Sequence, residues 1–212
     1  MSTEDCAHNH HHERRKLYRR LLIGVSSSIA LILSLVFLTW LILHPTKPTF
    51  VLEDATVYGF NLSAGPNIIT TEIQVTIASQ NPNERIGVFY DRVDVYATYR
   101  GEQITLPALL PESYQGHKDV TVWSPFLSGT SVPVAAFLAV ELGEDVNAGM
   151  VMINIRVDGW VRWKVGTFLS GRYRLYANCP AYLSFRGQYS PNSVLVGSTA
   201  KYQLVQTCHV EV

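Results

Sequence analysis

A run of 23 residues without a charged side chain, from Leu21 to Leu43, constrains this chain more than any other feature. As an α-helix the run would extend about 34 Å, and the hydrocarbon core of a bilayer is about 30 Å thick. Trp40 lies near one end, where aromatic side chains favour the interface between membrane and water. The sequence therefore predicts a transmembrane helix over residues 21–43.

The alternative for this run is a cleaved secretory signal. Such signals have an apolar core of about 7–15 residues, followed by a cleavage site made of small residues. The run here is longer, and it ends in Trp40-Leu41-Ile42-Leu43, which offers no pair of small residues. We therefore expect an uncleaved anchor.

The flanking charges predict how the anchor is oriented. Only Lys47 is basic close to the C-terminal side, whereas the N-terminal side carries Arg14, Arg15, Lys16, Arg19 and Arg20. Lys and Arg prefer the cytosolic side. We therefore expect a cytosolic tail at residues 1–20, a short linker at 44–48 and an outer domain at 49–212. The connector from His44 to Thr49 spans at most about 20 Å, so the domain should stay close to the bilayer.

The composition narrows the function classes. Lys+Arg and Asp+Glu both number 17, so the chain lacks the basic excess that a nucleic-acid binder needs. Hydrophobic residues make up 47% of the chain, which argues against disorder. A domain of this size can bury about 70% of its surface. We expect a folded outer domain and no nucleic-acid partner.

The outer domain shows the two-residue period of β-strands. From Val151 to Val165, one parity is apolar and the other is mostly polar, which predicts an antiparallel sheet with one buried and one solvated face. Fifteen residues would extend about 50 Å, longer than an ordinary strand. We therefore expect a bulge or bend at Gly159.

Similar alternation recurs in about six further segments, with Gly, Pro and Asn turn signals between them. One stretch differs, because Val134, Phe137, Leu138 and Leu142 follow helical spacing between Pro133 and Gly143. The sequence therefore predicts an all-β fold. We expect an antiparallel β-sandwich of about seven strands, similar to immunoglobulin and fibronectin type III domains, with one short helix.

No local motif indicates catalysis. The sequence lacks G-x-S-x-G, H-E-x-x-H, a phosphate-binding glycine loop and an EF-hand loop. The histidines of the outer part, His44, His117 and His209, show no metal-ligand spacing. The tract of His8, His10, His11 and His12 is of a kind that binds metals, but a solvated tail is the simpler interpretation. We expect no enzyme, no cofactor and no metal site.

Two covalent modifications are predicted. Cys179 and Cys208 both lie on the apolar parity of their strands, so they can meet in one core. An oxidising compartment favours a disulfide between them, and two buried free thiols are the alternative. Asn61-Leu62-Ser63 is the only N-x-[ST] sequon, so Asn61 is a candidate glycosylation site if this part of the chain is outside the cell.

Trp160, Arg162 and Lys164 form a candidate interaction surface. All three take the solvated parity of one strand, and Arg162 is placed to stack on Trp160. An exposed Trp with two cations close to the bilayer suits lipid headgroups or a protein partner. The alternative is that the helix or a loop covers Trp160.

Three ordered segments carry a family resemblance. They are Asn81–Asp91 (NPNERIGVFYD), Tyr114–Lys118 (YQGHK) and Val157–Gly166 (VDGWVRWKVG). The chain resembles plant harpin-induced-like, non-race-specific disease-resistance-like membrane proteins, which carry a late embryogenesis abundant group 2 domain. The resemblance implies a β-sandwich with a helix, location in the plasma membrane, a role in pathogen and stress responses, and no catalytic activity.

These observations lead to one functional interpretation and one main alternative. We expect a non-enzymatic, single-pass plasma-membrane protein of plant defence, with an apoplastic domain that binds protein partners. The alternative is a module that binds lipids or other amphiphiles in an apolar groove between the sheets. A densely filled core would argue against it. A hydration protectant is less consistent, because the composition is too apolar for a disordered protein.

Overall fold

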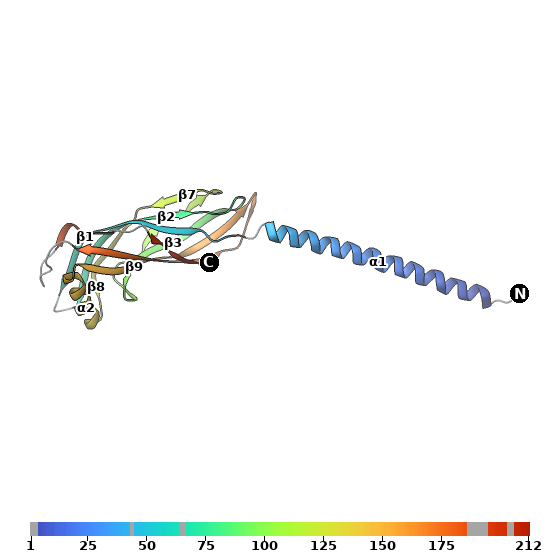
Figure 1. Cartoon of the computed structure of the whole chain (residues 1–212), viewed down its shortest axis with the longest axis horizontal. Helices are drawn as coiled ribbons and strands as arrows, with labels where there is room; N and C mark the ends of the chain where they lie inside the picture. Colours follow the sequence, from blue (N-terminus) through green and yellow to red (C-terminus); the bar gives the residue numbers. More distant parts are fainter. Residues whose placement is uncertain (1–3, 43–44, 64–66, 186–194, 203–205) are drawn as a thin grey trace. The chain divides into compact units, whose positions relative to one another are not determined.

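The computed structural model describes the backbone of residues 4–42, 45–63, 67–185, 195–202 and 206–212 (Figure 1). Side chains are described for residues 17–38, 45–62, 67–185 and 206–212. The chain divides into two compact units, Met1–His44 and Pro45–Val212.

The first unit is one long helix, α1 (Glu4–Ile42). Its stretch Leu17–Leu38 is long and apolar enough to cross a membrane. Ser26 and Ser28 donate to the carbonyls of Ile23 and Val25, so these hydroxyls are satisfied within the helix. Such internal bonding suits lipid, which offers no hydrogen-bond partners.

The helix also extends through most of the basic tail at residues 1–20, because α1 begins at Glu4. The backbone of the His8–His12 tract is therefore helical. Its side chains lie outside the described residues, as do those of Trp40 and His44.

The second unit is built from antiparallel strands and one helix, which confirms the predicted fold class. The strands are β1 (Thr49–Ser63), β2 (Ile68–Gln80), β3 (Gly87–Tyr99), β4 (Glu102–Gln103), β5 (Ala108–Leu110), β6 (Ser113–Gln115), β7 (Val120–Trp123), β8 (Phe126–Pro133), β9 (Met150–Val165), β10 (Phe168–Leu169), β11 (Tyr173–Phe185), β12 (Leu195–Tyr202), β13 (Gln206–Thr207) and β14 (His209–Glu211). Helix α2 (Ala136–Asn147) lies between β8 and β9 in the chain. Seven of the described strands have eight residues or more, consistent with the expected number.

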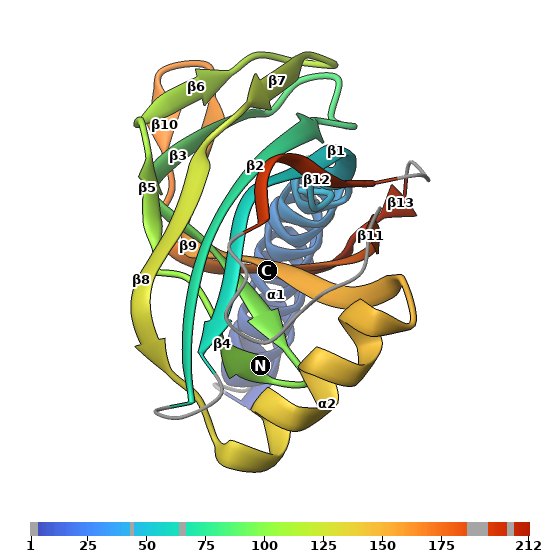
Figure 2. The ribbon, with the colours of Figure 1, turned by 90° about the vertical axis from the view of Figure 1, so that its left-hand side faces the viewer.

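One sheet with the strand order β4-β3-β9-β11-β12-β1-β2-β7 makes both layers. It folds over so that β1, β2 and β8 face β3, β9 and β11 (Figure 2). The two edges approach each other, since Leu106, which follows β4, donates its amide to the carbonyl of Ser128 on β8 at 2.8 Å.

The core lies between the layers and is filled from both. The predicted apolar parity of β9 is buried from Val151 to Trp163, and Phe50, Leu52 and Ile77 enter the core from the other layer. On β11 the buried parity begins at Leu175, and Tyr173, the first residue of the strand, is exposed. Val212, which follows β14, is also exposed.

The prediction of a bulge at Gly159 is wrong, and the alternative of a bend there stays a prediction. β9 continues through Gly159, and the register shift lies on β3 between Tyr90 and Arg92, with Asp91 as the extra residue. A Cβ at position 159 would lie 2.2 Å from the carbonyl oxygen of Arg92 and 2.7 Å from the Cα of Val93. Gly159 is therefore required by the close approach of the neighbouring main chain.

Helix α2 begins and ends later than predicted. Pro133 pairs with Ile68 as the last residue of β8, where an edge strand tolerates proline. Gly143 lies inside the helix, and Gly149, with φ of +86°, follows its end. Its amide donates to the carbonyl of Val146. The buried face consists of Leu138, Ala139, Leu142 and Val146, whereas Phe137 is exposed.

Gly159→Ala should destabilise the domain strongly, because its methyl group would overlap main-chain atoms that cannot move independently. Forced shifts of this kind cost about 1–3 kcal/mol, and we expect the upper part of that range. Gly59→Ala on β1 is the matched control, since a Cβ there meets nothing within 4 Å. Urea unfolding of residues 45–212, which contain the whole described core, measures both. Equal losses for the two variants would contradict the requirement at Gly159.

Candidate functional site

The Asn-Pro-Asn segment forms a buried turn. Asn81 Nδ2 donates to the carbonyls of Ile86 at 2.7 Å and Gly116 at 2.8 Å, and its Oδ1 accepts from the amide of Asn83 at 3.0 Å. Asn83 exchanges two hydrogen bonds with the main chain of Thr46, at 2.9 and 2.7 Å. This segment therefore joins the turn at Gly116 to the first residues of the outer unit.

A second buried network continues from this turn. The Tyr90 hydroxyl donates to Gln115 Oε1 at 2.8 Å and lies 2.7 Å from Ser79 Oγ. Gln115 Nε2 donates to the carbonyls of Ser79 at 2.6 Å and Asp119 at 3.0 Å. Burial raises the pKa of the Tyr90 phenol far above its ordinary value, so it remains a donor. These motif residues bond one another and the main chain, which assigns them a structural role.

Asp91 connects the first motif to the third. Its Oδ1 accepts from Arg162 Nε at 2.9 Å, and its Oδ2 accepts from Arg172 Nε at 3.2 Å. The Asp91 side chain is 11% exposed and that of Arg162 is 30% exposed. The extra residue on β3 therefore directs a carboxylate between two guanidinium groups on the outer face.

Arg162 and Lys164 belong to an aromatic–cation cluster with Phe89 and Tyr114. The two rings lie 4.6 Å apart. The Arg162 guanidinium is 5.8 Å from the Phe89 ring, and Lys164 Nζ is 5.0 Å from the Tyr114 ring. The predicted stacking of Arg162 on Trp160 is thus wrong. Phe89 is directly opposite Arg162 across the ladder, and such cross-strand neighbours are closer than residues two positions apart on one strand.

Trp160 lies apart from this cluster and is not covered, since 43% of it is exposed. It lines a depression of about 420 Å³ on the outer face. The other lining residues are Arg92, Asp94, Tyr96, Pro107, Asp158, Gly159 and Arg174. The structure therefore divides the predicted interaction surface into the aromatic–cation cluster and the Trp160 depression.

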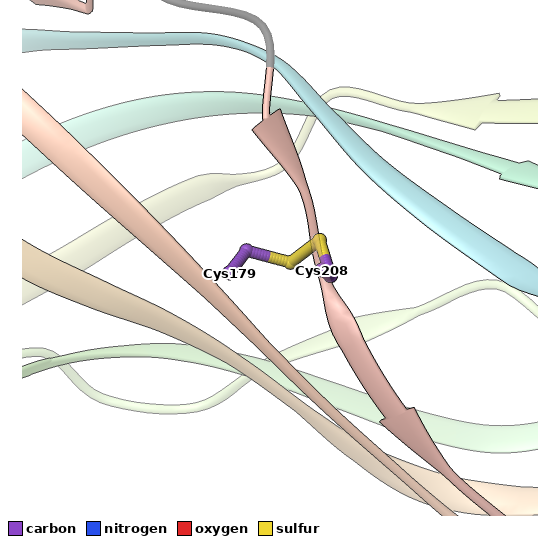
Figure 3. Close-up of a disulfide and its surroundings, with 2 residues drawn as sticks. All are labelled: Cys179 and Cys208. Atoms are coloured by element: carbon purple, nitrogen blue, oxygen red, sulfur yellow. A yellow bond between two sulfur atoms is a disulfide. The ribbon is translucent and has the colours of Figure 1, made fainter.

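Cys179 and Cys208 form a disulfide, as predicted in preference to free thiols (Figure 3). Their Cα atoms are 4.3 Å apart, and both residues are buried. Cys179 belongs to β11, and the residue after Cys208 begins β14, which pairs with β11. The bond thus attaches the C-terminal segment to the layer that contains β3, β9 and β11.

The remaining predicted residues belong neither to the aromatic–cation cluster nor to the lining of the Trp160 depression. Asn61 lies on β1 opposite Thr70 and is partly exposed, which leaves its glycosylation a prediction. His117 and His209 are exposed. Among the described side chains, no group of three or more His, Cys, Asp or Glu residues is placed to hold a metal.

Comparison with known proteins identifies the family. The model for late embryogenesis abundant proteins matches residues 76–179, which include all three motifs. NDR1/HIN1-like protein 1 of Arabidopsis thaliana is 51% identical over 211 residues, covering 99% of this chain and 100% of the relative. The chain belongs to the NDR1/HIN1-like family.

Further members support this relationship. NDR1/HIN1-like protein 12 of Arabidopsis thaliana is 48% identical over 213 residues, with 100% of both chains covered. NDR1/HIN1-like protein 26 is 39% identical over 79% of both chains. Among solved structures, a protein from Archaeoglobus fulgidus reaches a TM-score of only 0.33 at 9% identity, over 64% of this chain and 98% of that one.

Sequence reasoning missed part of the outer face of this NDR1/HIN1-like protein. The alternation of the sequence predicts only that Arg92 and Asp94 on one strand, and Arg174 on another, take solvated positions. In the structure, Arg92 and Arg174 both lie opposite Trp160. Strand alternation reveals which face a residue takes, but it does not reveal the neighbouring strand or the register.

Asp91→Asn should lower the free energy of unfolding by about 2–3 kcal/mol, somewhat less than the loss of one partner from a fully buried pair. The reason is that Arg162, which is mostly buried, loses its carboxylate. Asp158→Asn is the control, because its partner Arg174 is largely exposed and such pairs contribute little. Urea unfolding under non-reducing conditions measures both. A similar small effect for the two variants would contradict the structural role of Asp91.

Proposed function

We propose that this chain is a non-enzymatic single-pass plasma-membrane protein, with its N-terminus in the cytosol and its β-sandwich in the apoplast. In this proposal the β-sandwich binds partners during plant defence and stress responses. Membership in the NDR1/HIN1-like family supports a role in defence or stress, and the apolar helix fits a membrane anchor.

The arrangement of the anchor carries the proposal. Arg19 and Arg20 directly precede the uncharged run, and three further basic residues lie close before them. On the other side, a self-contained β-sandwich begins only a few residues after α1. By the positive-inside rule, this charge difference favours a cytosolic tail. The disulfide between Cys179 and Cys208 adds support, because such bonds persist in oxidising compartments.

The outer face of β3, β9 and β11 supports an interaction role. It presents the aromatic–cation cluster and, apart from it, the exposed Trp160 of β9. Aromatic residues and Arg dominate the energetics of many interfaces. The buried polar side chains of Asn81, Tyr90 and Gln115 in the motifs are engaged in internal bonds. The family is not known to be enzymatic, so we assign the domain to binding.

A lipid or amphiphile between the layers is less well supported. The inward-facing side chains of both layers are buried against one another in one core. The depression around Trp160 lies instead on the outer face. We therefore do not place an apolar ligand inside the sandwich.

Glycosylation at Asn61 provides a test of the proposed orientation. In plant cells the full-length chain should show a glycosidase-sensitive mass shift, because the sequon would enter the secretory lumen. Asn61→Gln and Ser63→Ala should both abolish the shift, since the first removes the asparagine of the sequon and the second removes its serine. The unmodified protein should stay in the pellet after an alkaline carbonate wash. Labelling of residues 1–20 by a non-permeant reagent on intact cells would contradict this orientation.

Proximity labelling in intact tissue tests the interaction role. With the full-length chain as bait, Phe89→Ala should reduce the recovery of neighbouring apoplastic proteins about tenfold, the factor that corresponds to 1.4 kcal/mol of binding free energy. Phe137→Ala on α2 is the matched control, because it removes an exposed phenylalanine outside the cluster. Unchanged recovery with Phe89→Ala would argue against the aromatic–cation cluster as the interface.

A further inference from the structure

We infer that the depression around Trp160 is a binding site for an uncharged saccharide, with a sugar ring stacked on the indole. This inference deepens the proposed function and rests on it for location, because saccharide polymers surround an apoplastic domain. The physical argument itself depends only on the side chains of the outer face.

The cross-strand register places Trp160 between two guanidinium groups. Arg92 on β3 lies directly opposite Trp160 on one side, and Arg174 on β11 lies opposite it on the other side. The next row of the same face contains Asp94 opposite Asp158. The indole therefore lies in the middle of a row of cations, beside a row of carboxylates.

The indole offers an open stacking surface. Trp160 is 43% exposed, so a ligand that covers its ring would remove apolar surface from water. The rings that carry a cation elsewhere on this face are Phe89, Tyr114 and Tyr176. Within the described residues neither Arg92 nor Arg174 stacks on the Trp160 indole. A pyranose ring has one face lined by C–H groups, and such a face can cover an indole while its hydroxyl groups point outward.

The charges around the ring favour hydroxyl groups over an anion. Arg92 Nε lies 3.5 Å from Asp94 Oδ2, and Arg174 donates to both oxygens of Asp158, at 3.2 and 2.8 Å. Two cations and two carboxylates sum to zero, so a phosphate or uronate would gain no net attraction. A hydroxyl group both donates and accepts, so neighbouring hydroxyls can bond a carboxylate and a guanidinium at once.

The shape and the rim suit a small polar ring. The depression of about 420 Å³ falls within the usual range of small-molecule sites, roughly 300–1,000 Å³. Tyr96 and Pro107 add a phenol and an apolar edge to its lining.

A protein partner fits this depression less well. The centre of a protein interface is depleted of charged residues, and a protein covering Trp160 would also cover four ionised side chains. Desolvating such groups is expensive unless each is rebonded. A saccharide can bond them while leaving part of their hydration in place.

Binding of defined oligosaccharides tests the inference. The full-length chain in lipid nanodiscs would be titrated with cellohexaose and xylohexaose as uncharged probes, and with a galacturonic acid hexamer as the anionic control. Calorimetry and tryptophan fluorescence would follow binding. We expect an uncharged hexasaccharide to bind and the anionic one to bind more weakly. Trp160→Ala should weaken binding about tenfold or more, equivalent to 1.4 kcal/mol or more, and Trp160→Tyr should retain most of it.

Two further variants distinguish an effect on saccharide binding from an effect on folding stability. Asp94→Asn should weaken saccharide binding with little change in the unfolding midpoint, because it replaces one of two acceptor oxygens by an amino group in a pair whose Arg92 is largely exposed. Tyr182→Ala is the matched aromatic control, since Tyr182 is exposed on β11 opposite Met152 and outside the depression.

The results that would overturn the inference are distinct. Absence of binding to both uncharged probes, preference for the anionic probe, or wild-type affinity in Trp160→Ala would each reject it. The inference would also be rejected if a defined protein bound through Trp160 while the saccharides failed to bind. Because purified protein is used, none of these results depends on membrane orientation. The Asn61 experiment can therefore fail or succeed independently.

Discussion

The close approach of β9 to β3 determines which side chains meet on the outer face of this protein. The carbonyl of Arg92 occupies the space that a side chain at position 159 would need, so only glycine permits this pairing. One extra residue at Asp91 then shifts the register by one position. The shift puts Arg92 opposite Trp160 while leaving Phe89 opposite Arg162. The depression and the aromatic–cation cluster both follow from this short segment of the ladder.

The family motifs and the candidate binding residues have different physical roles. The polar side chains of Asn81, Tyr90 and Gln115 are buried and bonded internally. They hold turns that have little regular secondary structure, and each bond satisfies a group that would be costly to bury alone. Trp160 and its charged neighbours are instead open to solvent on the rigid layer. A scaffold that is satisfied internally can present such a surface without reorganising when a ligand binds.

Several elements could be predicted because they depend on local patterns. The alternation from Val151 to Trp163 indicated which residues are buried, and the same parity placed Cys179 and Cys208 in the core where they form a disulfide. The position of α2 was less accurate, since Pro133 and Gly143 are compatible with several roles. Pro133 became the end of an edge strand, and the helix ended before Gly149 instead. The local sequence is compatible with each of these roles for Pro133 and Gly143, and the tertiary structure decided which one each residue takes.

The apolar run, the basic residues before it and the two-residue period of the outer part were determined by the sequence alone, because each depends on neighbours within a few residues. The register of β3 against β9 was decided only by the tertiary structure. It brings together Asp91 and Arg162, which are 71 positions apart, and it surrounds Trp160 with Arg92 and Arg174. Strand pairing depends on packing across the whole core. The alternation of apolar and polar residues within one strand is compatible with many neighbouring strands and registers.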